Sequence, residues 1–167
     1  CQNSLAIIAK QSGNYILADS LYNESILSGD KIGNKRYNAT TYQNLGMLYN
    51  DYYFLNGKKI SDLNKSSNYY KKSIQLSQES NFHTQLMSGY TFLVANNMIL
   101  DLYENAIKYS NKSYKIAVNI ENNFFQEKNL LNIGKLYIKI GNYEEAFKIL
   151  ENEIFQKSDN IHFKLLQ

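Results

Sequence analysis

The strongest constraint on the fold is the spacing of small and apolar residues in the segment 130–150, which reads LLNIGKLYIKIGNYEEAFKIL. Positions 130, 133, 134 and 137 share one face of a helix, and so do positions 143, 146 and 150. Gly141 lies between these two runs, where the left-handed residue that ends a helix is usually glycine. The spacing therefore predicts two helices joined by a tight turn.

The same spacing recurs earlier in the chain. Residues 13–25 reproduce the second helix and residues 42–49 the first, and a weaker copy covers residues 90–113. Small residues recur where paired helices would cross, and they allow the two backbones to approach. These small residues are Ala18, Gly46, Ala106, Gly134 and Ala146.

Proline is absent from all 167 residues, so the commonest helix breaker and loop former is missing. This absence argues against an all-β sandwich or barrel. A turn is expected at Asn56-Gly57-Lys58-Lys59. The helices are predicted at residues 1–12, 14–29, 36–54, 61–79, 83–99, 101–120, 123–140 and 143–157, with another beginning at 160–167.

These repeated residues resemble the tetratricopeptide repeat. The resemblance implies an all-α fold, a right-handed superhelix (solenoid) of about four antiparallel helix hairpins. Gly46, Val94 and Gly134 are equivalent positions spaced more widely than the usual period of about 34 residues, which is similar to a long-period subgroup of about forty residues found in bacterial regulators and sensors. We expect one solenoid domain over residues 1–167, as part of a longer array.

Charge and cysteine content limit the kinds of partner. A net charge of +3 is too small to indicate a nucleic-acid ligand, and no direct nucleic-acid binding is expected. No apolar run is long enough for a membrane span. Cys1 is the only cysteine, so no intramolecular disulfide is expected. We expect a cytoplasmic location. The alternative is a periplasmic or lipid-anchored protein in which Cys1 is the processed end, rather than the point where the chain was cut.

The sequence shows no catalytic or metal-binding constellation. His83 and His162 lie on separate predicted helices, whereas a metal site needs three or four converging ligands. Glu144 and Glu145 are adjacent, so they point about 100° apart and cannot act as a catalytic pair, but Glu144 can pair with Lys148. We therefore expect no enzymatic activity, no cofactor and no metal. The many tyrosines sit at packing positions and are expected in the core rather than on a base-stacking surface.

The resemblance places a peptide-binding groove along the first helices of the hairpins. One polar row, at spacings of four, three and four residues, lies opposite the apolar face of the last full repeat. Its lysines can meet an acidic segment or a free carboxylate, Asn44 and Asn132 can bond to a peptide backbone, and Phe92 and Ile99 can contact an apolar side chain. The groove residues are Thr40, Asn44, Met47 and Asp51, then Ser88, Phe92, Ala95 and Ile99, then Lys128, Asn132, Lys135 and Lys139.

The function that follows is non-catalytic binding of a protein or peptide segment in this groove. The third repeat has Ser88 and Phe92 where the carboxylate clamp of chaperone-binding relatives has basic residues, so that ligand is not expected. One alternative is a sensory or oligomerisation segment of a larger bacterial transcriptional regulator or signalling protein. A second alternative is a structural scaffold that forms homo-oligomers through its outer surface.

Overall fold

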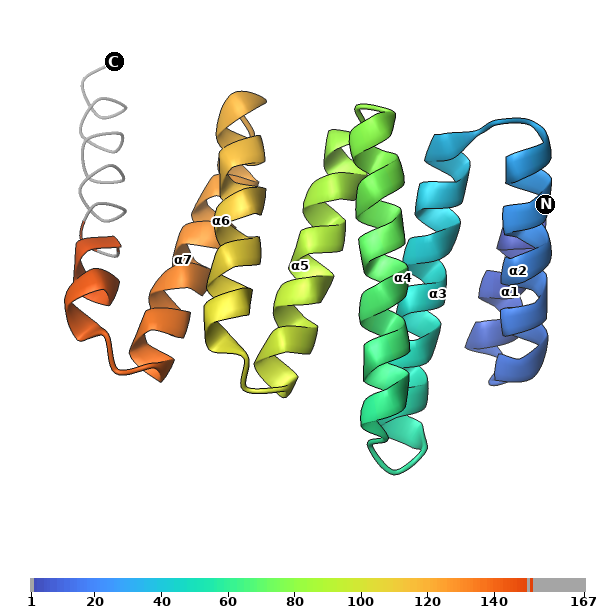
Figure 1. The fold of residues 1–167 in the computed structure, drawn as a ribbon, viewed down its shortest axis with the longest axis horizontal. Coiled ribbons are helices and arrows are strands. Elements are labelled where there is room, and N and C mark those ends of the chain that lie inside the picture. The colour runs from blue at the N-terminus through green and yellow to red at the C-terminus, as the bar shows by residue number, and fades with distance from the viewer. Residues whose placement is uncertain (1, 150, 152–167) are drawn as a thin grey trace, which may run out of the picture. The chain divides into compact units, whose positions relative to one another are not determined.

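The computed structural model describes residues 2–149 and 151, and within them the chain is helical with short turns and no strand. Seven helices precede a further helical stretch at 143–149 (Figure 1). The seven are α1 (Gln2–Gln11), α2 (Tyr15–Lys31), α3 (Lys35–Leu55), α4 (Ile60–Glu79), α5 (His83–Ile99), α6 (Tyr103–Asn119) and α7 (Asn123–Lys139). The all-α prediction is confirmed, and each of these seven helices agrees with its predicted bounds to within two residues.

Two predictions extend beyond the described residues. The helix predicted at 143–157 is seen at 143–149 and at residue 151. The helix predicted at 160–167 lies outside the described residues, as does His162.

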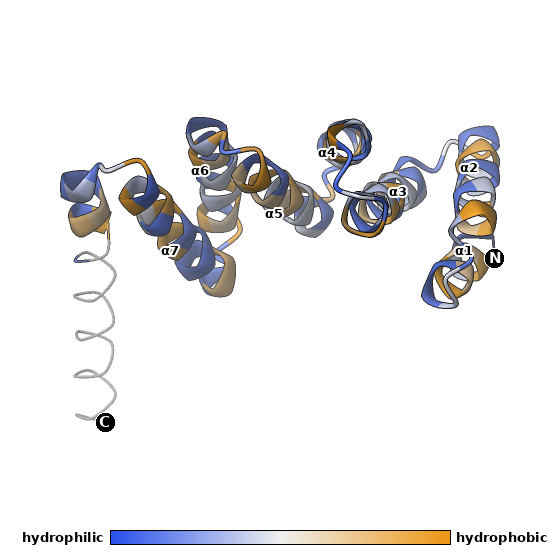
Figure 2. Cartoon of the chain, turned by 90° about the horizontal axis from the view of Figure 1, so that it is seen from below, coloured by the Kyte–Doolittle hydropathy of each residue, from blue (hydrophilic) through white to orange (hydrophobic). Residues whose placement is uncertain are grey.

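The chain divides into two compact units, Cys1–Asn96 and Asn97–Gln167. In the first unit, contacts follow chain order: α1 packs on α2, α2 on α3, and α3 on α4. In the second unit, α6 packs on α7. Hydrophilic and hydrophobic residues alternate around the helices (Figure 2), as expected when each helix buries a face against its neighbours in the chain. The single solenoid over residues 1–167 stays a prediction.

In four of the turns a left-handed residue precedes an asparagine, at Gly13, Gly33, Glu121 and Gly141. Gly141 has φ +77°, as predicted, and Gly57 has φ +74° within the predicted 56–59 turn. The side chains of Asn14, Asn34 and Asn122 each accept a hydrogen bond from a backbone N–H three residues later. These caps satisfy N–H groups that the first turn of a helix leaves without partners.

Small residues do hold the helices close together. Ala18 and Ala106 are fully buried. A Cβ atom at Gly46 on α3 would lie 2.5 Å from Cδ1 of Tyr70 on α4, and one at Gly89 on α5 would lie 2.7 Å from Cγ1 of Ile74 on α4. Only glycine therefore fits at these two crossings without a shift of the neighbouring helix.

Buried polar pairs connect the second helix of one hairpin to the first helix of the next. Asn96 on α5 donates to the hydroxyls of Ser66 and Ser67 on α4, both at 3.0 Å. Asn129 on α7 donates to the hydroxyl of Ser113 on α6 at 3.0 Å. Such bonds are available only when the two helices are in one register, so they favour that register.

Replacing Gly46 with alanine tests the close approach of α3 and α4. Helix propensity alone would raise stability by about 1 kcal/mol, because alanine is the better helix former. We expect G46A instead to lower the free energy of unfolding by about 1–3 kcal/mol, because the methyl group overlaps the Tyr70 ring. Urea denaturation measures this change. As a control, Ala95→Gly at an exposed helical position measures the difference in helix propensity between alanine and glycine without a packing effect. A G46A variant more stable than the wild type would contradict the close contact between Gly46 and Tyr70.

Candidate functional site

The predicted groove residues of α3 lie on one face, and part of that face is used by α1. The Asn44 side chain donates to Asn3 Oδ1 at 3.1 Å. Lys10 Nζ lies 2.8 Å from Asp51 Oδ2. Thr40 and Met47 are half-buried. Asn44 and Asp51 therefore bind a neighbouring helix of the same chain, which leaves them less of their bonding capacity for a ligand.

The predicted residues of α5 are also partly used in packing. Phe92 stacks on Tyr70 of α4 with 4.9 Å between ring centroids and planes 10° apart. Ser88 is half-buried, whereas Ala95 is exposed. Ile99 belongs to the second unit.

On α7 the predicted row is the most accessible of the three. Lys128, Lys135 and Lys139 are exposed and Asn132 is half-buried. The Lys128 ammonium lies 5.7 Å from the Phe125 ring centroid. Ile133, on the opposite face, is 1% exposed, so the predicted division of this helix into a packed and a polar face is confirmed. A groove that joins the rows of α3, α5 and α7 stays a prediction.

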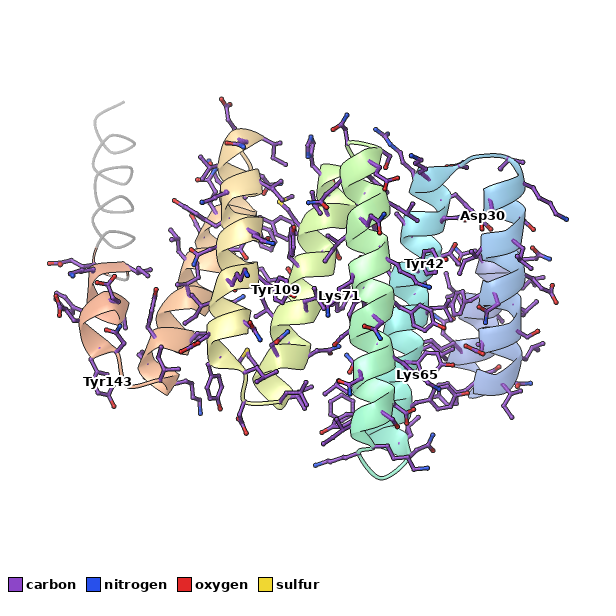
Figure 3. The ribbon with its side chains drawn as sticks, in the orientation of Figure 1. Asp30, Tyr42, Lys65, Lys71, Tyr109 and Tyr143 are labelled. Atoms are coloured by element: carbon purple, nitrogen blue, oxygen red, sulfur yellow. The ribbon has the colours of Figure 1, made fainter. Side chains whose placement is uncertain are left out.

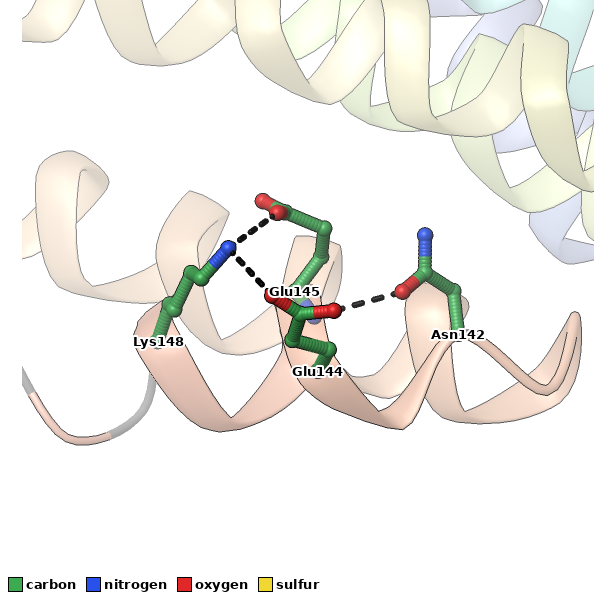
Figure 4. Close-up of polar contacts among 4 residues, drawn as sticks. All are labelled: Asn142, Glu144, Glu145 and Lys148. Atoms are coloured by element: carbon green, nitrogen blue, oxygen red, sulfur yellow. Dashed lines mark hydrogen bonds and ion pairs between the residues drawn. The ribbon is translucent and has the colours of Figure 1, made fainter.

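The acidic pair Glu144–Glu145 forms ion pairs with Lys148 (Figure 4). The Lys148 ammonium lies 2.9 Å from Oε1 of Glu144 and 2.9 Å from Oε1 of Glu145. These hydrogen bonds, Glu144 first, raise the pKa of Lys148. The predicted pairing of Glu144 with Lys148 is confirmed.

His83 is exposed at the start of α5. Within residues 2–149 and 151, no group of three or more His, Cys, Asp or Glu side chains is placed to hold a metal ion. Across the same residues, no helix combines the length and hydrophobicity needed to traverse a lipid bilayer.

A feature absent from the sequence predictions is a continuous row of five tyrosine rings across α2, α3 and α4. Neighbouring ring centroids lie 5.5, 5.4, 5.4 and 6.2 Å apart, which are distances typical of aromatic pairs. We call this row the tyrosine ladder. Its rings, in spatial order, are Tyr15, Tyr52, Tyr49, Tyr69 and Tyr42.

The expected core role of the tyrosines therefore has three outcomes. Tyr22 and Tyr70 are 1% and 0% exposed, so for them the prediction is confirmed. The ladder rings are only partly buried and pack against the edge of the core formed by α1, α2 and α3. For Tyr143 the prediction is wrong, because its side chain is 68% exposed.

Two lysines of α4 lie over the ladder. Lys65 Nζ is 5.1 Å from the Tyr49 centroid, and Lys72 Nζ is 5.2 Å from that of Tyr42 and 5.8 Å from that of Tyr69. Figure 3 shows Tyr42 and Lys65 between α4 and α2. A pocket of about 480 Å³ opens here, and we call it the tyrosine–lysine pocket. Its lining residues are Tyr49, Lys65, Asn68, Tyr69 and Lys72.

Burial and nearby carboxylates raise the pKa of four ladder phenols, those of Tyr42, Tyr49, Tyr52 and Tyr69. Desolvation is the main cause of a raised pKa for Tyr49, and its hydrogen bond to Asp19 adds to the shift. Desolvation also raises the pKa of Tyr69, and Asp19 and Tyr42 contribute. In the neighbouring core, burial raises the pKa of Tyr22 to about 12.

The sequence contained a signal for this pocket. Lys65, Asn68, Tyr69 and Lys72 follow spacings of three, one and three residues, so they share one face of a helix. Tyr42 and Tyr49, seven residues apart, share a face of the preceding helix. What the spacing could not show is that these two faces meet beside α2.

Comparison with known proteins agrees with the helical-repeat architecture. A family model described as tetratricopeptide repeat matches residues 128–152. The chain is 26% identical over 141 residues to the regulatory protein RapG of Bacillus subtilis (strain 168), a match that covers 84% of this chain and 37% of RapG. The predicted tetratricopeptide-type repeat is confirmed for residues 128–152.

Two solved structures show the same fold. The apo form of RapI superposes with a TM-score of 0.75 at 19% identity, over 95% of this chain and 56% of RapI. Aspartyl phosphate phosphatase F from Bacillus subtilis superposes with a TM-score of 0.69 at 17% identity, over 95% of this chain and 40% of that protein. This chain thus spans less than two thirds of the length of each of these three proteins.

The ladder predicts how stability depends on alkaline pH. Because the pKa of Tyr49 is higher in the folded chain than the usual 10, the unfolded chain loses this proton first as pH rises. The contribution of Tyr49 to the free energy of unfolding is therefore fully present below pH 10 and declines above it. We expect Tyr49→Phe to reduce that decline, measured as the difference in the free energy of urea unfolding between pH 9 and pH 11. An equal decline in the wild type and the variant would contradict the assignment.

Proposed function

We propose that this chain is a non-catalytic binding module that holds a protein or peptide segment along the first helices of its hairpins. The observation that supports the proposal most strongly is the polar face of α7. Lys128, Lys135 and Lys139 present three exposed ammonium groups on one side of a helix whose other side is buried. An ammonium group is a hydrated point charge that suits carboxylates, so the preferred partner is an acidic segment or a chain end with a free carboxylate.

The rows on α3 and α5 contribute less charge to this interaction. Asp51 is already paired with Lys10, and Phe92 is stacked on Tyr70. The exposed Ala95 and Ile99, which is 36% exposed, offer a small apolar surface. The exposed lysines of α7 are therefore where an acidic part of the partner is expected to bind.

A second candidate is a sensory or oligomerisation segment of a larger bacterial regulator. The similarity to RapG, which is described as a regulatory protein and of which this chain spans 37%, favours it. The two candidates differ in whether binding controls a further domain. Expression of the complete gene product with and without the bound peptide would separate them by the activity of that domain.

Reversing charge on α7 tests the binding face. We expect K135E/K139E to weaken binding of a fluorescein-labelled octaglutamate peptide about tenfold, because two attractive contacts become repulsive. Fluorescence anisotropy measures the dissociation constant. K108E/K115E makes the same change in net charge at exposed positions of α6 and should weaken binding less than threefold. Unchanged affinity in K135E/K139E, or equal losses in both variants, would contradict the α7 site.

A further inference from the structure

The tyrosine–lysine pocket lies on a different side of α3 from the predicted groove. Tyr49 follows Asn44 by five residues, which is a rotation of about 140° at 100° per residue. Asn44 faces α1, whereas Tyr49 contacts the Tyr69 ring of α4. A ligand in this pocket would therefore not compete for the groove face of α3.

The pocket combines two positive charges with an aromatic floor. The Lys65 and Lys72 ammoniums are held over tyrosine rings by cation–π attraction. These contacts orient both ammoniums toward the pocket before any ligand arrives. Asn68, between them on the same helix face, adds an amide that can donate to or accept from a peptide backbone.

The acidic groups near the pocket lie beneath or beside the ladder. Asp19 is bonded to the Tyr49 hydroxyl, and it raises the pKa of Tyr52 and Tyr69 as well. Asp62 acts on Tyr52 and Asp30 on Tyr42. None of these three carboxylates lines the pocket, and among the residues that the structure describes, its charged lining groups are the two lysines. The charge that a ligand meets there is positive.

We propose that the tyrosine–lysine pocket is a second docking site, which binds an extended acidic peptide of the pattern acid–x–apolar–x–acid. Lys65 and Lys72 are seven residues apart on a helix, a rise of about 10 Å. In an extended peptide, residues i, i+2 and i+4 point the same way, and i and i+4 are about 13 Å apart. Two carboxylates at i and i+4 then reach the two lysines, and the side chain at i+2 lies between the two ammoniums, against the parts of the Tyr49 and Tyr69 rings that line the pocket.

The observations favour this ligand over two others. A cationic ligand would have to displace the Lys65 and Lys72 ammoniums from the rings that they already cover. A single-stranded nucleic acid needs ring faces that are open for stacking, whereas the ladder rings are partly buried and pack against one another.

The test uses the whole chain and a fluorescein-labelled peptide with glutamate at positions i and i+4 and phenylalanine at i+2, separated by serines. Fluorescence anisotropy should show that K65A/K72A weakens binding at least tenfold. Lys71→Ala, at a neighbouring exposed lysine outside the pocket lining, should change affinity less than twofold. Replacing the peptide's phenylalanine with serine should weaken binding to the wild type at least threefold.

The same assay separates this proposal from the groove. Because the groove proposal also accepts an acidic segment, K135E/K139E should weaken binding of the phenylalanine peptide less than K65A/K72A does. Loss of binding in K135E/K139E but not in K65A/K72A would contradict the pocket proposal and remain consistent with the groove proposal. Equal affinity for the charge-reversed lysine peptide, or tighter binding of an oligothymidine of similar length, would overturn the acidic-peptide assignment. Circular dichroism of each variant confirms that the helices are retained.

Discussion

The close approach of α3 and α4 is the contact on which the first unit depends. Gly46 lets the Tyr70 ring lie directly against the α3 backbone, and Tyr70 in turn supports Phe92 of α5 on its other side. Because α3 is held this close to α4, its rotation about its own axis is fixed, and so is the neighbour that each of its other faces meets. One side of α3 then meets α1 through Asn44 and Asp51, and another meets the gap between α2 and α4, where the ladder forms.

Local sequence signals predicted most of the fold. The left-handed Gly141, the buried Ala18 and Ala106, and the helix bounds all follow from spacing and backbone preference, which act over a few residues. The asparagines that cap the helices explain how the chain makes sharp turns without proline. These features could be predicted because each depends on residues that are neighbours in the chain.

The candidate sites could be predicted less well, because they depend on which helix faces meet. The α7 row was found from its own spacing, and its lysines are exposed as expected. The contacts of Asn44 with Asn3 and of Asp51 with Lys10 join residues about forty positions apart, and no local pattern indicates them. The pocket was missed for the same reason: tyrosines at packing spacings are typical of a core, and only the arrangement of three helices leaves these partly open.

The tyrosine ladder is the most direct consequence of this packing, and its order can be measured. Proton NMR with tyrosine-selective labelling, assigned by single Tyr→Phe variants, reports which rings have protons within about 5 Å of each other. The account predicts cross-peaks of Tyr52 with Tyr15 and Tyr49, and of Tyr69 with Tyr49 and Tyr42. Absence of the cross-peak between Tyr49 and Tyr69 would show that α3 and α4 do not present one shared surface, and would contradict the account.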